Sequence, residues 1–169
     1  MLAVAFTGES NSGKTTLIEK LVRLIKSQNP KAKICVIKHD PKDKAQIDNN
    51  LKKDSAKFFH AGADVAILGT NSTTLRFQNA LNLESVIYKF GECDYLFVEG
   101  LKELELPRIC VARDSFNERF LPHICAIALD SSIKIESLEK YNLPLLDLNN
   151  EAKILEWILQ NIKEYKWQK

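Results

Sequence analysis

The segment at residues 8–15 has the residue types and spacing that indicate chemistry most directly. It reads GESNSGKT and fits the phosphate-loop pattern G-x-x-x-x-G-K-[ST] at every fixed position. Gly8 and Gly13 let the backbone turn tightly and approach a ligand with no Cβ atom in the way. The N–H groups of such a loop, together with the N-terminus of the next helix, point toward phosphate oxygens. The segment therefore predicts a site for the phosphates of ATP or GTP.

Side chains at the end of the loop are expected to add specific contacts. Lys14 would place its ammonium group on the β- and γ-phosphates, the Thr15 hydroxyl would complete the shell of a magnesium ion, and Thr16 would meet the α-phosphate side. Mg²⁺ is accordingly the metal that the motif predicts. The residues predicted to bind the nucleotide are Gly8, Ser10, Asn11, Ser12, Gly13, Lys14, Thr15 and Thr16.

The residues on either side of the loop have the patterns that this motif requires. Residues 2–7 form an apolar run typical of a strand buried on both faces. From Thr15 onward, leucine and isoleucine recur at three- and four-residue spacing, which indicates an amphipathic helix that ends at Asn29 and Pro30. A chance match in a glycine- and serine-rich turn is the alternative, and the flanking strand and helix disfavour it.

Two carboxylates, Asp40 and Glu99, are predicted to support the magnesium ion. Asp40 follows an expected strand at residues 33–38, and Glu99 ends another at residues 95–99. In an open α/β sheet, ligands bind outside the carboxyl ends of the strands, so both acids are placed to face the site. The alternative for each is an ordinary charge at the end of a strand.

These acids complete the expected catalytic and metal-binding sets. We predict Lys14, Asp40 and Glu99 as catalytic residues, and Thr15, Asp40 and Glu99 as the residues around the metal. His39 could contact a phosphate or could simply be a turn residue.

The fold class follows from apolar strands that alternate with helices. This alternation predicts an α/β fold, a P-loop NTPase three-layer sandwich with a mostly parallel central sheet and helices on both faces. The 169 residues suit a single domain over 1–169, with a mobile loop at residues 40–53 and an antiparallel intruder at 73–78. Further strands are expected at 64–69, 108–113, 124–129 and 145–148, and helices at 54–60, 83–90, just before 142 and from 151.

Composition and charge argue against several classes of protein. The chain is 45% apolar and 27% charged, as soluble globular proteins are, and its net charge of +2 lacks the basic bias of a dedicated nucleic-acid binder. No apolar run is long enough to span a bilayer, and residues 2–6 lack the basic leader of a signal peptide. We therefore expect a cytoplasmic protein with no nucleic-acid or membrane partner. The four cysteines and three histidines are too scattered to predict a zinc or redox site.

Several sequence blocks, taken together, resemble the MobB family of adapter proteins of molybdopterin-guanine dinucleotide biosynthesis. The blocks come in the family's order and cover roughly residues 1 to 113. The phosphate loop alone is shared by many P-loop proteins, whereas the later blocks together are much more specific. The blocks are 8–17 (GESNSGKTTL), 37–40 (IKHD), 53–55 (KDS), 61–63 (AGA), 98–102 (VEGLK) and 107–109 (PRI).

The resemblance implies a GTP-binding protein with Mg²⁺ and weak GTPase activity, usually a homodimer. It also implies a partner, a MobA-like molybdopterin-guanylyltransferase, to which the adapter hands nucleotide or molybdopterin. Asp40 and Glu99 match family acids near the metal, and Lys53, Asp54 and Lys102 match family positions beside the site.

The chain departs from the family pattern in one loop. Residues 41–43 read PKD where the family typically has further histidines and an aromatic residue, and residues 51–52 read LK where it tends to have Pro-Gly. A family role for the 41–52 loop is therefore not carried over.

The choice of GTP rests on the resemblance, because the sequence has no guanine-reading N-K-x-D block. Asp130 could accept hydrogen bonds from a guanine edge, or it could cap the following helix. Arg108 and Arg113 could bind a phosphate group of molybdopterin, or they could be solvated charges at strand ends.

Two other functions stay open at this point. A small-molecule kinase would use ATP on the same loop and would need an arginine-bearing lid, for which residues 113–119 (RDSFNER) could qualify. A binding module would use the nucleotide only to stabilise a dimer. Residues 73–78 and 108–113 could pair as edge strands between two chains.

Overall fold

The computed structural model describes residues 1–40, 54–101 and 104–165. Within it the chain forms two compact units, one made of residues 1–39 and 92–169 and the other of residues 40–91. The expectation of one domain over the whole chain is not tested by this division and stays a prediction. The second unit is inserted into the chain of the first between residues 39 and 92.

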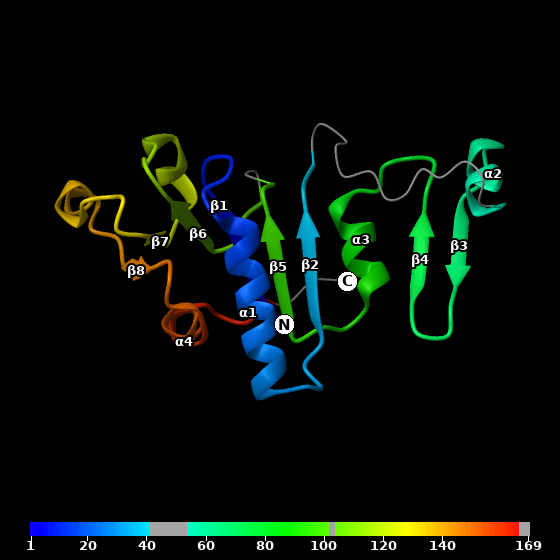
Figure 1. Cartoon of the computed structure of the whole chain (residues 1–169), viewed down its shortest axis with the longest axis horizontal. Helices are drawn as coiled ribbons and strands as arrows, with labels where there is room; N and C mark the ends of the chain where they lie inside the picture. Colours follow the sequence, from blue (N-terminus) through cyan, green and yellow to red (C-terminus); the bar gives the residue numbers. More distant parts are fainter. Residues whose placement is uncertain (41–53, 102–103, 166–169) are drawn as a thin grey trace. The chain divides into compact units, whose positions relative to one another are not determined.

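The first unit is built on a six-stranded sheet in which every pairing is parallel (Figure 1). The strand order is β2-β5-β1-β6-β7-β8, so the strand that leads into the phosphate loop lies near the middle. This arrangement confirms the predicted α/β class with a mostly parallel central sheet. The strands are β1 (Leu2–Thr7), β2 (Ile34–Lys38), β5 (Tyr95–Glu99), β6 (Arg108–Ala112), β7 (Ala126–Leu129) and β8 (Leu145–Asp147).

Helices α1 (Lys14–Gln28) and α4 (Glu151–Asn161) contact each other and cover one face of this sheet. Leu17, Leu21 and Ile158 are among the buried residues that join the two helices to the inward side chains of β1. All six residues of β1 are buried, as expected for a central parallel strand. Burial of these apolar side chains is the main force that holds β1 and α1 together around the loop between them.

The opposite face of β6 and β7 packs against short 3₁₀ segments. Phe120 and Ile124 come from the 3₁₀ helix Glu118–His123 and the residue after it, and they pack with Cys110 and Ile127 of the sheet. The helix expected just before residue 142 is instead a pair of 3₁₀ turns, Ile135–Ser137 and Glu139–Tyr141. Pro122 lies inside the 3₁₀ helix Glu118–His123, where its missing N–H disfavours a longer α-helix.

The second unit contains α2 (Asp54–His60), α3 (Leu83–Phe90) and a separate hairpin of β3 (Val65–Leu68) and β4 (Thr73–Arg76). The hairpin is antiparallel but forms a sheet of its own, so residues 73–78 are not the antiparallel intruder in the central sheet that the sequence predicted. The central sheet contains neither strand.

The strand order also corrects the idea that residues 108–113 form an edge strand between two chains. β6 lies inside the sheet, paired with β1 on one side and β7 on the other, so its backbone groups have no place for a strand of a second chain.

None of the helices in the described part of the chain has the length and apolar character that a membrane span requires.

Candidate nucleotide-binding site

The phosphate loop joins the carboxyl end of β1 to the first residue of α1. Gly8 has φ 140° and Gly13 has φ 100°, so both adopt backbone conformations that favour glycine. A Cβ atom on Gly8 would lie 2.1 Å from the carbonyl oxygen of Val111, which no side chain could tolerate. The close approach of β6 therefore explains why this end of the loop needs glycine.

Lys14 lies along the inside of the loop. Its Nζ donates to the carbonyl oxygen of Glu9 at 2.6 Å and to that of Gly8 at 3.3 Å. Partial burial lowers the pKa of Lys14, and the negative charge of Glu99 partly offsets this effect. Phosphate oxygens entering the loop would take over the acceptor role that these two carbonyls now fill.

Ser12 supplies a second sign that the loop is built around a ligand. Its side chain is almost fully buried, and its hydroxyl has no hydrogen-bond partner among the described residues. A buried polar atom without a partner costs free energy, on the order of 1–3 kcal/mol. A phosphate-bearing ligand fits a loop that holds an ammonium group and an unsatisfied hydroxyl together.

Thr15 and Glu99 meet at the carboxyl ends of β1 and β5. The Thr15 hydroxyl donates to Oε2 of Glu99 at 2.8 Å, and the Glu99 side chain is only 13% exposed. The parallel register of β1 and β5 places Phe6 opposite Glu99, which brings the end of β5 up to the start of α1. A hydroxyl and a carboxylate in contact form an oxygen donor set of the kind that Mg²⁺ uses.

Lys38 is a member of this cluster that the sequence reasoning did not select. Its Nζ lies 3.2 Å from Oε1 of Glu99 and 3.3 Å from the hydroxyl of Thr15. Lys38 and Glu99 are opposite each other in the register of β2 and β5. The signal was the lysine within the IKHD block, but its partner could be found only once the strand order was known. The ammonium group of Lys38 is thus bound by oxygens of Thr15 and Glu99, which shows that this cluster can hold a cation.

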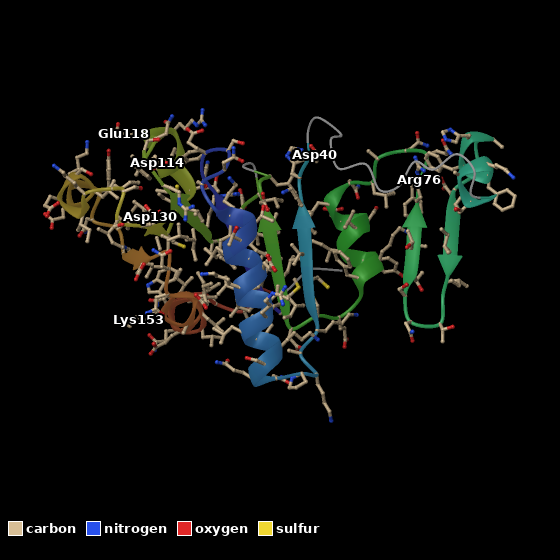
Figure 2. All side chains as sticks on the ribbon, in the orientation of Figure 1. Asp40, Arg76, Asp114, Glu118, Asp130 and Lys153 are labelled. Carbon is tan, nitrogen blue, oxygen red and sulfur yellow. The ribbon has the colours of Figure 1, made fainter. Side chains whose placement is uncertain are left out.

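Four other predicted site residues belong to the second unit or lie outside the described residues. Asp40 follows directly after β2 and His39 (Figure 2) and is the first residue of the second unit, which also contains Asp54 at the start of α2. Lys53 and Lys102 lie outside the described residues. The predicted roles of these four residues therefore stay predictions.

Arg108 has neither of the roles considered for it. Its side chain is only 2% exposed, so it is not a solvated charge. It donates to the carbonyl oxygens of Gly100, Leu101 and Leu104 at 3.0, 3.0 and 2.9 Å. Arg108 is therefore committed to holding the loop that follows Glu99, and is not directed toward a phosphate group.

Arg113 and Asp130 form an ion pair beside the first turn of α1. Arg113 Nε donates to Oδ2 of Asp130 at 2.8 Å, while Oδ1 accepts from the backbone N–H of Ser132 at 3.0 Å. The second contact closes a local turn, and Asp130 does not cap the next 3₁₀ helix, Ile135–Ser137, whose N-cap is Lys134. A small cavity of about 60 Å³ adjoins this pair and is lined by Gly13, Thr16, Leu17, Arg113, Leu148 and Asn149.

A larger hollow, of about 440 Å³, lies beyond the carboxyl ends of β6 and β7. Figure 2 labels Asp114 and Glu118 in this region, together with Asp130. The Glu118 carboxylate accepts hydrogen bonds from Lys140 and from the hydroxyl of Tyr141. The residues that line the hollow come from two segments, 114–118 and 132–141, and include Asp114, Phe116, Glu118, Ser132, Lys134 and Tyr141.

Comparison with known proteins identifies a family with which this geometry is consistent. The profile of the family described as molybdopterin guanine dinucleotide synthesis protein B, MobB, matches residues 3–130. A putative molybdopterin-guanine dinucleotide biosynthesis adapter protein of Methanocaldococcus jannaschii is 29% identical over 161 residues, covering 88% of this chain. That match spans 66% of the archaeal protein, just under two thirds of its length. A probable adapter protein of the same kind from Bacillus subtilis is 26% identical over 163 residues, covering 95% of this chain and 92% of its own.

Solved structures agree on the fold. The crystal structure of Bacillus subtilis MobB superposes with a TM-score of 0.72 at 22% identity, covering 98% of this chain and 100% of that one. A hydrogenase maturation factor, HypB of Archaeoglobus fulgidus, superposes with a TM-score of 0.53 at 18% identity, covering 94% of this chain and 87% of its own. At this identity the likeness extends to the fold alone. The family profile covers most of the chain, and the chain therefore belongs to the MobB family.

Proposed function

We propose that this chain is a GTP-binding adapter that uses Mg²⁺, hydrolyses GTP slowly, and serves the biosynthesis of molybdopterin-guanine dinucleotide. The observation that carries the proposal is the contact of Thr15 with Glu99 at the end of a loop that also holds Lys14. The pathway comes from the relatives, which are named as adapters of that biosynthesis. Membership of the family favours this role over a small-molecule kinase that uses ATP.

Each described residue of the site has a part in the proposed binding. The loop N–H groups and Lys14 would hold the phosphates, while Thr15 and Glu99 would hold the magnesium ion, Glu99 through water. When bound, Mg²⁺ would neutralise negative charge on the phosphate oxygens. Thr16 and the small cavity beside Arg113 lie where the α-phosphate side of the nucleotide would continue.

Slow turnover is expected because none of the described arginines near the loop is directed at the position of a γ-phosphate. Arg108 is buried against carbonyl oxygens, and Arg113 is paired with Asp130. P-loop GTPases turn over on the order of 10⁻⁴ to 10⁻² per second without an external arginine. We expect hydrolysis in that range.

The proposed partners are a MobA-like guanylyltransferase, molybdopterin and a second copy of this chain. The hairpin of β3 and β4 supports the last of these. It exposes Ile67 (47%), Leu68 (80%) and Leu75 (49%), and a two-stranded sheet leaves backbone groups on its outer edges. Light scattering of the purified chain would test the homodimer.

The test of the proposed function is calorimetric titration of the chain with GTP and with ATP in the presence of Mg²⁺. We expect a clear preference for GTP, lost in Lys14→Ala. Lys26→Ala is the matched control, because Lys26 lies in the last turn of the same helix and bonds only to the carbonyl of Pro30 among the described contacts. A clear preference for ATP would contradict the guanine assignment, and binding that survives Lys14→Ala would contradict the phosphate site.

A further inference from the structure

The second residue of the phosphate loop, Glu9, is tied to a segment more than a hundred residues later in the chain. Its Oε2 lies 2.6 Å from Nη2 of Arg119, and its Oε1 accepts a hydrogen bond from Nδ2 of Asn117 at 3.2 Å. The two contacts engage both oxygens of the carboxylate. The loop is therefore braced from outside as well as by its own backbone.

The segment that supplies these contacts is held by packing on the sheet. Asn117 caps the 3₁₀ helix Glu118–His123, its Oδ1 accepting from the N–H of Arg119 at 3.0 Å. Phe120, the next residue, is 5% exposed and belongs to the cluster on β6 and β7. Its ring centroid is 4.8 Å from the Arg119 guanidinium. Arg119 is thus placed by ordered neighbours on both sides.

The charge of Glu9 makes this bracing relevant to the ligand. A carboxylate within a loop that receives phosphates repels them, and the repulsion grows with the number of charges on the ligand. An arginine paired with that carboxylate cancels the repulsion. The pair is partly exposed, with Arg119 at 52% and Glu9 at 37%, and such pairs contribute little to folding stability.

We propose that Arg119 is a positioning residue of the phosphate loop, which acts on the ligand through Glu9 by holding the loop and cancelling its negative charge. The proposal rests on the proposed nucleotide-binding function. It gives the segment at residues 113–119 a role different from that of a kinase lid, since the arginine acts on the loop and not on a phosphate group. The ligand class it serves is a nucleoside di- or triphosphate.

A double-mutant cycle tests the proposal. Affinities for GTP, GDP and GMP with Mg²⁺ would be measured by calorimetry for the unaltered chain, Arg119→Gln, Glu9→Gln and the double variant. We expect Arg119→Gln to lose about tenfold in GTP affinity, with a smaller loss for GDP and least for GMP. In the double variant GTP affinity should return to within about threefold of the unaltered chain, because the uncancelled charge is gone.

Two further variants control for the fold and for charge in general. Arg119→Lys keeps the positive charge and should keep most of the affinity. Arg23→Gln removes an arginine from another exposed ion pair, with Glu19 at 2.8 Å on α1, and should change nothing. The thermal midpoint of unliganded Arg119→Gln should match that of the unaltered chain. If that variant is destabilised, the ratio of its GTP affinity to its GMP affinity still decides, because a fraction of unfolded protein lowers both apparent affinities equally.

Three outcomes would overturn the inference. An equal loss from Arg119→Gln in the Glu9→Gln background would mean that Arg119 contacts phosphate directly. Unchanged GTP affinity in Arg119→Gln would mean that the ion pair has no part in binding, while the proposed function would stand. Absence of nucleotide binding in the unaltered chain would overturn the proposed function together with this inference.

Discussion

The ammonium group of Lys38 forms an ion pair with the carboxylate of Glu99 across the neighbouring strands β2 and β5, with Nζ 3.2 Å from Oε1. The same ammonium group lies 3.3 Å from the Thr15 hydroxyl. A side-chain cation is therefore bound by the two oxygens that would serve a magnesium ion. A magnesium ion bound there would compete with Lys38 for the same acceptors.

Lys38→Met should lower the Mg²⁺ concentration needed for half-maximal GTP binding, by roughly three- to tenfold. Methionine keeps most of the length of the side chain and removes its charge, so the oxygens of Thr15 and Glu99 are released to the metal. The measurement is a magnesium titration of GTP binding, with Lys31→Met as an exposed control just before β2. A higher magnesium requirement in Lys38→Met would show that Lys38 assists the phosphates instead.

Glu99→Gln should remove the part of GTP affinity that depends on Mg²⁺ and slow hydrolysis by at least about tenfold. Glutamine can still accept a hydrogen bond from Thr15, so the local structure is kept while the negative charge is lost. Binding in EDTA should be unchanged. Glu105→Gln, on the exposed loop before β6, is the control. Equal loss with and without magnesium would mean that Glu99 has a structural role only.

Gly8→Ala should destabilise the unliganded chain by on the order of 2–4 kcal/mol, because its Cβ atom would meet the Val111 carbonyl oxygen at 2.1 Å. Gly13→Ala is the matched variant, since Gly13 also has positive φ but the nearest atoms to an added Cβ are 3.8 Å away. It should cost about 1–2 kcal/mol from backbone strain alone. Urea denaturation measures both. Similar losses in the two variants would contradict the close approach of β6.

Alkaline pH should weaken GTP binding through Lys14. Burial lowers the pKa of this lysine below its usual value of 10.5, so its ammonium group loses the proton at lower pH than an exposed lysine does. Affinity then falls as pH rises through that lowered pKa. Lys14→Arg stays charged throughout and should lack this fall, whatever its absolute affinity. The guanine ring of GTP also ionises at alkaline pH, but this affects binding to the unaltered chain and to Lys14→Arg equally. Identical pH profiles for the two proteins would therefore contradict the assignment of the fall to Lys14.

The local parts of the fold could be predicted because their signals lie within a few residues. The glycine spacing around Lys14, the apolar run of β1 and the period of α1 each depend on neighbours in the chain, and the structure has them as expected. The position of Glu99 at the end of an apolar strand was enough to select it as a site acid, and the structure shows its carboxylate in contact with Thr15.

The residues that were missed, or were given another role, depend on pairings between distant segments. Lys38 meets Glu99 only because β2 and β5 are neighbours, and Arg108 is buried only because β6 lies between β1 and β7. Arg119 reaches Glu9 from a 3₁₀ helix, whose short irregular sequence has no period to read. Strand order is set by the packing of the whole sheet, and one sequence does not encode it in any local pattern.

The insertion of residues 40–91 between β2 and β5 has a mechanical consequence. The ladder of β2 and β5 continues one step past the strands, where the N–H of His39 donates to the carbonyl oxygen of Glu99 at 2.9 Å, and the next residue already belongs to the inserted unit. The inserted unit is thus joined to β2 directly after His39, next to the cluster of Lys38, Glu99 and Thr15. Tension applied to that connection by a bound protein would load the hydrogen bond between His39 and Glu99 first, and would then separate β2 from β5 and draw Lys38 away from Glu99.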